Sequence, residues 1–163
     1  MLNRKSLLSP ESGPALQFAK YAICGGIATG TNILIFYVLG WRMLPCLQPD
    51  DVLIRLLHLH VAALGDALRA HNATLANTIA FLFSNFVAYL LNILFVFRAG
   101  RHHRLVELGL FYAVSGVSFL IGTLLMRWLI HDFGTMTTIA FGSNIIVALL
   151  INYAMRKFVI FKG

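Results

Sequence analysis

The chain has 163 residues, of which 59% are hydrophobic and only 12% are charged, and its formal net charge is +7. A soluble domain of this size needs more polar surface to cover its core, and a mean hydropathy of +0.80 is typical of a membrane protein. Long apolar blocks occupy nearly the whole chain, which excludes a substantial soluble catalytic domain.

Four apolar blocks follow one another along the chain, at about residues 21–41, 75–97, 108–130 and 137–161. Each is long enough to cross a hydrocarbon core of roughly 30 Å as an α-helix, which needs about 20 residues. Helices are expected because they pair their own backbone amides and carbonyls within lipid. The sequence therefore predicts an all-α membrane protein with four transmembrane helices in a single domain, residues 1–163.

The segment between the first two blocks, residues 42–73, is long for a loop. Its apolar residues recur at helical spacing over residues 53–68, while Arg55, Asp66 and Arg69 occupy other faces. This pattern predicts an amphipathic helix at the outer membrane interface or, equally, a packed helix that covers the bundle. A fifth span is disfavoured because these charges would lie in hydrocarbon.

Basic residues are distributed unevenly between the two sides of the predicted bundle. Nine of the 13 Lys and Arg residues fall before the first block, between the second and third, or in the tail from residue 156 onward, against two acidic residues. The other side carries four basic and four acidic residues. Cytoplasmic loops of membrane proteins carry the excess of Lys and Arg. The protein is therefore predicted to span the cytoplasmic membrane with both termini on the cytoplasmic side. The charge is then a signal of topology, and nucleic-acid binding is not expected.

An internal repeat relates the second and fourth blocks. Both contain the string Thr-Ile-Ala-Phe, at residues 78–81 and 138–141, followed within four residues by a Ser-Asn pair. Each block then continues to a further asparagine, Asn92 or Asn152. We expect two tandem units of two helices. Both units enter the membrane in the same direction, because each has an even number of spans, so the repeat is parallel.

Further motifs mark the beginning of the first block and the ends of the repeated blocks. An aromatic-basic-aromatic start, followed by glycines and an asparagine, is formed by Phe18, Lys20, Tyr21, Gly25, Gly26 and Asn32. Residues 88–97 and 152–161 approximate the form Asn-Phe-x-x-Asn-Arg-x-Trp-Val-Phe. With these motifs the chain closely resembles the GtrA-like family of small membrane proteins, over residues 16–162 except for the long outer loop.

The resemblance implies a role in the synthesis of cell-surface polysaccharide or glycolipid. The family is linked with moving polyprenyl-phosphate-linked sugars across the cytoplasmic membrane, often beside a membrane glycosyltransferase. The leading functional hypothesis is therefore translocation of such a lipid-linked sugar. The alternative is a membrane scaffold or accessory subunit for a glycosyltransferase. A proton-coupled exporter is disfavoured, since no predicted span contains an acidic residue at membrane depth.

Polar side chains within the predicted spans are candidates for contact with the sugar. A side-chain amide offers two donors and an acceptor, which suits sugar hydroxyls in a dry groove. The alternative is hydrogen bonding between helices, worth about 0.6–2 kcal/mol per bond in membranes. The residues expected to line the groove are Asn32, Asn85, Tyr89, Asn92, Asn144, Asn152 and Tyr153.

Basic residues at the cytoplasmic ends of the spans are candidates for binding the lipid phosphate. Guanidinium and ammonium groups bind phosphate oxygens at that depth. The alternative is attraction to anionic lipid headgroups, worth about 1 kcal/mol per residue. The candidates are Lys20, Arg98, Arg156 and Lys157.

Two pairs of small residues, Gly26-x-x-x-Gly30 and Ser118-x-x-x-Gly122, favour close helix contacts within the bundle or between protomers. Since four helices enclose little volume, a homodimer is expected. The pairs His58/His60 and His102/His103 lack acidic or cysteine partners at ligand spacing, and no nucleophile–base set or phosphate-binding glycine loop is recognisable. We therefore expect no enzymatic activity, no metal and no cofactor.

Overall fold

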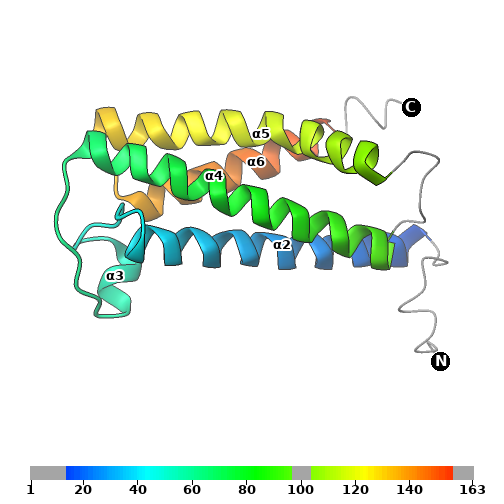
Figure 1. Cartoon of the computed structure of the whole chain (residues 1–163), viewed down its shortest axis with the longest axis horizontal. Helices are drawn as coiled ribbons and strands as arrows, with labels where there is room; N and C mark the ends of the chain where they lie inside the picture. Colours follow the sequence, from blue (N-terminus) through cyan, green and yellow to red (C-terminus); the bar gives the residue numbers. More distant parts are fainter. Residues whose placement is uncertain (1–13, 97–103, 156–163) are drawn as a thin grey trace.

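The computed structural model describes residues 14–96 and 104–155, and all regular secondary structure in these residues is helical. The long helices are α2 (Pro14–Arg42), α4 (Asp66–Leu91), α5 (Arg104–Phe133) and α6 (Thr137–Met155). A short helix α3 (Val52–Leu56) follows α2, and a π-helical turn η1 (Asn92–Val96) continues α4. The long helices lie side by side in one bundle (Figure 1).

Three segments of these helices are long and apolar enough to cross a membrane: Ala19–Arg42, Asp66–Phe95 and Phe111–Phe133. Within α6, Thr137–Ile151 is an apolar helix of shorter described length. Large apolar side chains cover the outside of the bundle; Leu34 and Leu124 are each 65% exposed. The prediction of an all-α membrane protein is thus confirmed, whereas the fourth span, the parallel repeat and the cytoplasmic termini stay predictions.

Most helix boundaries extend beyond those predicted from hydropathy. The helix α4 begins at Asp66 rather than near residue 75, and α5 covers Arg104–Phe133 rather than about 108–130. Hydropathy marks the part of a helix that can lie in hydrocarbon, whereas backbone hydrogen bonding continues into polar surroundings. The end of the fourth predicted span, residues 156–161, lies outside the described residues.

The prediction of one amphipathic helix over residues 53–68 is wrong. Within this range, residues 53–56 belong to α3 and residues 66–68 to α4, whereas residues 57–65 lack helical structure. His58 adopts a left-handed backbone conformation with φ of 51°, which ends the helix. Because Asp66 and Arg69 belong to the first turn of α4, the apparent periodicity joined residues of two separate elements.

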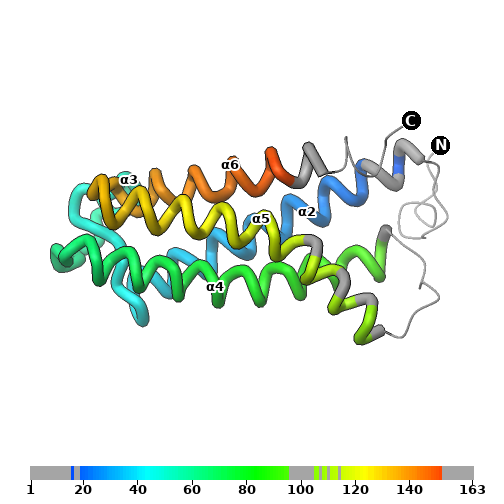
Figure 2. The backbone as a smooth tube through the Cα atoms, turned by 90° about the horizontal axis from the view of Figure 1, so that it is seen from above, coloured from blue at the N-terminus to red at the C-terminus, as the bar shows by residue number. Residues whose placement is uncertain are grey.

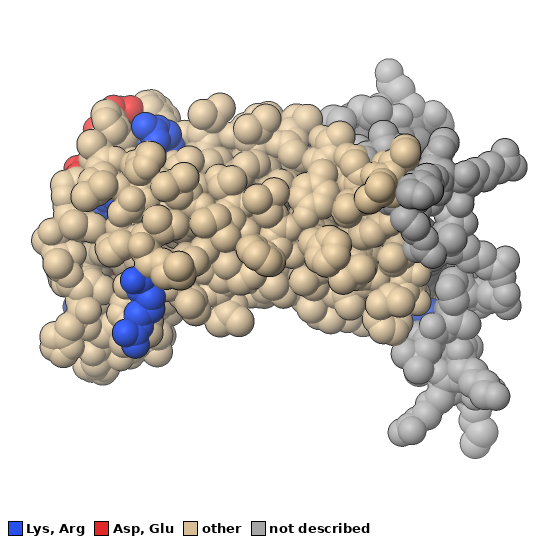
Figure 3. Space-filling view, in the orientation of Figure 1, with Lys and Arg blue, Asp and Glu red and all other residues tan. Residues whose placement is uncertain are grey.

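The helices pack in chain order, α2 against α4, α4 against α5 and α5 against α6. One end of the bundle carries α3 and the α5–α6 turn, and we call it the loop end. The opposite end, where α2 begins, is the terminal end (Figure 2). On the face shown in Figure 3, the coloured Lys, Arg, Asp and Glu side chains of the described residues lie mostly near the loop end, and the middle of this face is free of them.

The apolar core lies in the half of the bundle nearest the loop end. A row of buried alanines on α4, from Ala70 to Ala80, lets the neighbouring helices approach closely. Across the bundle, the Phe36 ring of α2 stacks on Phe141 of α6, with centroids 3.8 Å apart. Tyr37 meets the same Phe141 ring edge-on at 5.8 Å. Aromatic stacking therefore joins α2 to α6 in this half of the molecule.

A buried polar network fastens the loops to the helices at the loop end. Arg69 has an exposed fraction of 0% and donates to Asp66 Oδ1 at 2.7 Å and to the Thr135 carbonyl at 2.9 Å. Asp51, also fully buried, accepts hydrogen bonds from the backbone amides of Gln48 at 2.9 Å and Thr138 at 2.8 Å. The network thus joins the α2–α3 loop, the start of α4 and the α5–α6 turn.

Cys46 lies in the same region, and we expect its buried thiol to react very slowly with thiol reagents in the folded protein. Burial, with a smaller contribution from the Asp51 carboxylate, raises the pKa of the Cys46 thiol to about 12. Because only the thiolate reacts, we expect a water-soluble maleimide at pH 8 to label the folded Cys24→Ser variant negligibly and the denatured variant readily. The unfolded thiol has a pKa of about 8.5, so its thiolate fraction at pH 8 is on the order of 1,000-fold larger.

The same pKa change makes the contribution of Cys46 to stability depend on pH. Between about pH 8.5 and 12 the folded state keeps a proton that the unfolded state releases, so this contribution falls as pH rises through that window. Rapid labelling of the folded variant at pH 8 would contradict the buried position of Cys46.

Candidate functional site

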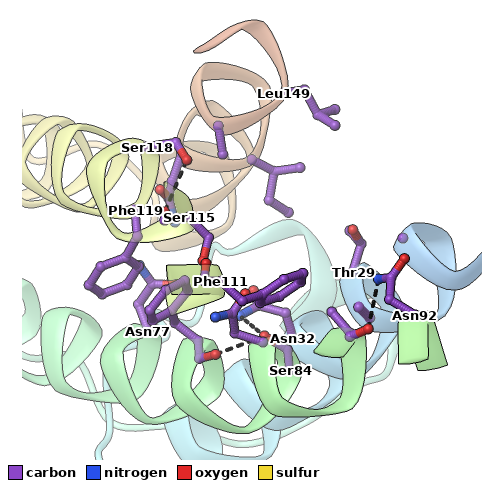
Figure 4. A pocket seen from close by; sticks show the side chains of 18 of the residues that line it. Thr29, Asn32, Asn77, Ser84, Asn92, Phe111, Ser115, Ser118, Phe119 and Leu149 are labelled. Carbon is purple, nitrogen blue, oxygen red and sulfur yellow. Dashed lines mark hydrogen bonds between the residues drawn. The ribbon is translucent and has the colours of Figure 1, made fainter. Parts of the chain in front are cut away.

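A cavity of about 520 Å³ lies between α2, α4, α5 and α6, in the half of the bundle nearest the terminal end. Its walls combine aromatic rings with amide and hydroxyl side chains (Figure 4). No Lys, Arg, Asp or Glu is among the described residues that line it. The polar lining residues are Tyr21, Thr29, Asn32, Asn77, Ser84, Asn85, Asn92, Ser115, Ser118 and Asn144.

The helix α4 changes character along its inward face. Toward the loop end its buried residues are mostly alanines, together with Arg69 and Asn77. Toward the terminal end Ser84, Asn85 and Ala88 line the cavity, followed by Asn92 of η1. Residues three to four positions apart lie above one another on one side of a helix. The same helix therefore seals the core in one half of the bundle and lines the polar cavity in the other.

Two of the cavity asparagines form hydrogen bonds between helices. Asn77 Nδ2 on α4 donates to Thr123 Oγ1 on α5 at 2.8 Å, and the Asn77 side chain is 1% exposed. Asn32 Nδ2 on α2 donates to Ser84 Oγ on α4 at 3.2 Å. These two amide groups therefore form hydrogen bonds between helices, the alternative to sugar contact that the sequence left open for the intramembrane asparagines.

Asn85 and Asn92 differ, because each is buried with an unpaired polar atom. Asn85 is 7% exposed, and its Nδ2 has no hydrogen-bond partner among the described residues. Asn92 is 5% exposed; its Nδ2 donates to the Ala88 carbonyl at 2.7 Å, but within residues 14–96 and 104–155 its Oδ1 has no partner. A buried polar group without a partner costs about 1–3 kcal/mol. A ligand in the cavity that both donates and accepts could satisfy both atoms.

The backbone also departs from regular helix geometry at this point. Asn92 begins the π-helical turn η1, which extends to Val96. Turns of this kind inside α-helices frequently occur at functional sites, where they shift side chains relative to the regular helix. The unpaired Oδ1 of Asn92 therefore lies where α4 widens, beside the cavity.

Asn144 supplies the α6 wall of the cavity and depends on a glycine opposite. The Asn144 side chain is 6% exposed and packs directly against Gly122 of α5. A Cβ atom at residue 122 would overlap Asn144 Oδ1 and lie 3.1 Å from Asn144 Cγ. The small pair Ser118-x-x-x-Gly122 thus packs within the bundle, while Gly26 and Gly30 lie exposed on α2 with no atom within 4 Å of a Cβ at either position.

A substitution at Gly122 should therefore reshape the cavity. We expect Gly122→Ala to displace the Asn144 amide and to lower the free energy of unfolding by about 1–3 kcal/mol, the usual cost of overpacking. Thermal unfolding in detergent would measure the loss. Gly116→Ala, on the same helix with no atom within 4 Å of the added methyl group, is the matched control and should be nearly neutral. Equal stability of the two variants would contradict this packing.

The predicted groove residues fall into three groups. Asn32, Asn85, Asn92 and Asn144 line the cavity together. Tyr89 does not line it: its buried ring packs edge-on against Phe111 at 5.9 Å, because position 89 lies off the cavity-facing side of α4. For residues 152–153 the structure places the helix α6 but does not describe the side chains.

Of the predicted phosphate-binding residues, only Lys20 is described. It lies on α2 directly before the cavity-lining Tyr21, and its side chain is 8% exposed. Arg98, Arg156 and Lys157 lie outside the described residues. The serines of α5 were not predicted as part of the site, although Ser115 and Ser118, three residues apart in an apolar span, form a polar stripe that could have indicated it.

Among the described residues, no group of three or more His, Cys, Asp or Glu side chains could hold a metal ion. A bundle of long helices with an apolar exterior, and with segments apolar and long enough to cross a bilayer, defines an integral membrane protein. A family model described as the GtrA/DPMS transmembrane domain matches residues 51–161, and the chain belongs to this family. The match covers α3 to α6 but not α2. No curated protein and no solved structure matches the chain.

Proposed function

We propose that the protein moves a polyprenyl-phosphate-linked sugar across the cytoplasmic membrane, and that the asparagine-lined cavity receives the sugar. The observation that carries this proposal is the pair of unpaired buried atoms, Asn85 Nδ2 and Asn92 Oδ1, beside an uncharged polar cavity inside a membrane bundle. A sugar entering hydrocarbon loses hydrogen bonds to water at a cost of several kcal/mol. Amide and hydroxyl groups on four helices can replace those bonds. Membership of the GtrA/DPMS family supports this substrate class.

The lipid phosphate would remain near the membrane surface while the sugar enters the cavity. We place it at Lys20, whose helix also carries the cavity residue Tyr21, together with the predicted partners Arg98, Arg156 and Lys157. Basic groups at this depth suit the negative charge of a phosphate. With both termini cytoplasmic, as the basic residues favour, the cavity lies in the cytoplasmic half of the membrane.

Passage toward the other side is closed in the described conformation. Between the cavity and the loop end lie the stacked rings of Phe36 and Phe141 and the network around Arg69. Helices that follow one another in the chain, such as α2 and α4, pack extensively, whereas α2 and α6 make few contacts with each other. We infer that translocation requires α2 and α6 to separate at Phe36 and Phe141, so that the sugar can pass between them.

Purified protein in liposomes with a labelled polyprenyl-phosphate sugar tests the proposal. The labelled lipid is placed in one leaflet, and its accessibility to a membrane-impermeant reagent is followed from each side. We expect transbilayer movement well above that in empty vesicles of the same lipid composition. Movement no faster than in empty vesicles overturns the proposal.

The second candidate function is a membrane scaffold or accessory subunit for a glycosyltransferase. The observation that favours it is the exposed face of α2, where Ile23 is 63% exposed and Gly26 has open space around its Cα. A glycine on an apolar helix face lets a partner helix approach closely. We propose this face, formed by Ile23, Gly26 and Ile27, as the contact of a homodimer. Loss of function in Gly26→Leu, with full function in variants of the cavity asparagines, would favour the scaffold.

A further inference from the structure

A second hollow, of about 410 Å³, lies on the side of α2 away from the asparagine-lined cavity. One wall is formed by α2 from Gly30 to Trp41, and the other by the α2–α3 loop, α3 and the residues just after it, including Leu47, Leu53 and Leu57. Helical periodicity places the two sets of α2 residues on opposite faces, so the helix separates the polar cavity from this apolar groove.

The location and shape of the groove restrict what can fill it. Its α2 wall belongs to the segment Ala19–Arg42, which is apolar and long enough to span a membrane, so the groove borders lipid hydrocarbon. From Gly30 to Trp41 it extends about 16 Å along the helix axis. Along this length the lining side chains are apolar, apart from the polar atoms of Tyr37 and Trp41. An apolar groove of this length, open to hydrocarbon, suits a lipid chain lying along α2.

A cation lies at the loop-end mouth of this groove. The Arg42 guanidinium carbon is 3.9 Å from the ring centroid of Trp41, a residue that lines the groove. Arg42 is exposed, and no carboxylate of the described residues forms an ion pair with it. Arg55 of α3 is a second exposed cation, between the groove residues Leu53 and Leu57. A positive charge beside an apolar groove complements a lipid with an anionic phosphate.

We propose that this groove binds one hydrocarbon chain of an anionic phospholipid, whose phosphate interacts with Arg42. The chain occupies the space from Trp41 down to Gly30, and the headgroup stays at the membrane surface. Trp41 contributes twice, because its ring lines the groove and holds the guanidinium in place. This site does not depend on transport of a sugar.

Photo-crosslinking in nanodiscs tests the occupancy of the groove. The full-length protein is placed in phosphatidylcholine nanodiscs containing a fixed fraction of phosphatidylglycerol with a diazirine-bearing chain, and the labelled residues are mapped by mass spectrometry. We expect labels to concentrate on the groove walls. Gly30→Leu places an isobutyl side chain on the α2 wall of the groove, and no atom lies within 4 Å of its Cβ position. It should lower groove labelling about five-fold or more.

Gly109→Leu is the matched control, because Gly109 is an exposed glycine of α5 with equally open surroundings and does not line the groove. Its groove labelling should equal that of the unmodified protein. Equal labelling in Gly30→Leu and the unmodified protein overturns the proposal.

The headgroup assignment is tested with the same probe and with a phosphatidylcholine probe of identical chains. Arg42→Gln should lower the preference for phosphatidylglycerol over phosphatidylcholine by about five-fold, the effect of one basic residue at a membrane surface. Arg127→Gln, another exposed arginine near the loop end and outside the groove, should leave the preference unchanged. An unchanged preference in Arg42→Gln overturns the assignment. Competition by added polyprenyl phosphate, but not by added phosphatidylglycerol, overturns it in favour of the carrier lipid.

Discussion

Replacing Asn85 with leucine is expected to slow sugar-lipid translocation by about ten-fold or more without lowering stability. The unpaired Nδ2 of Asn85 gains no hydrogen bond from the protein, so its removal costs no existing bond and relieves the burial of a polar group. We expect the free energy of unfolding to stay constant or to rise by about 1 kcal/mol. Asn92→Leu should slow translocation in the same way, although it loses the bond from Nδ2 to Ala88. Liposome translocation and thermal unfolding in detergent measure the two effects separately.

Asn77→Leu is the matched control for these variants. Asn77 lines the same cavity and is also buried, but its Nδ2 donates to Thr123 Oγ1 at 2.8 Å. Its replacement breaks a bond between α4 and α5 and leaves the buried Thr123 hydroxyl without that partner, so a loss of about 1–2 kcal/mol is expected. If Asn85→Leu destabilises the protein as much as Asn77→Leu and leaves translocation intact, then Asn85 forms a hydrogen bond between helices and does not contact the sugar.

Arg69→Met is expected to produce the largest loss of stability, about 3 kcal/mol. Methionine keeps much of the volume of the fully buried side chain but removes its charge-assisted hydrogen bonds to Asp66 and the Thr135 carbonyl. With the Gln48 amide oriented so that its oxygen faces Arg69, Nε also donates to it at 3.1 Å. The substitution therefore releases the α2–α3 loop and the α5–α6 turn together. Unfolding in detergent, followed by circular dichroism, measures the difference.

Arg127→Met is the control for this prediction, because Arg127 is exposed on α5 and forms no ion pair among the described residues. A surface substitution of this kind usually changes stability by less than about 0.5 kcal/mol. A similarly small effect of Arg69→Met would show that the loop end does not depend on its buried arginine.

The same loop end illustrates where sequence patterns mislead. Residues 53–68 have apolar spacing typical of one helix, yet the chain forms a single short turn of helix and then an extended connection to α4. Arg69 was predicted to lie on a face other than the apolar one, and the structure buries it fully. Periodicity reports which side chains avoid water, but a network of hydrogen bonds to distant loops can bury a charge that periodicity places outside.

The candidate site shows a similar division. The asparagines were identifiable in the sequence, since amides are costly inside an apolar span unless they bond to something. Which of them bond to the protein depends on neighbours far away in the chain: Thr123 satisfies Nδ2 of Asn77, Ser84 accepts from Asn32, and Nδ2 of Asn85 is left unpaired. No local pattern distinguishes these three cases.

The length and apolarity of the four blocks were enough to assign the class of this protein, because they are compatible only with helices in a bilayer. Its repeated asparagine motifs also indicated the family, which the family match confirms. That α2 has a polar cavity on one face and an apolar groove on the other could be seen only in three dimensions. The physical reason is that a cavity is space left between helices, and that space depends on how closely side chains such as Gly122 and the alanines of α4 let their neighbours approach.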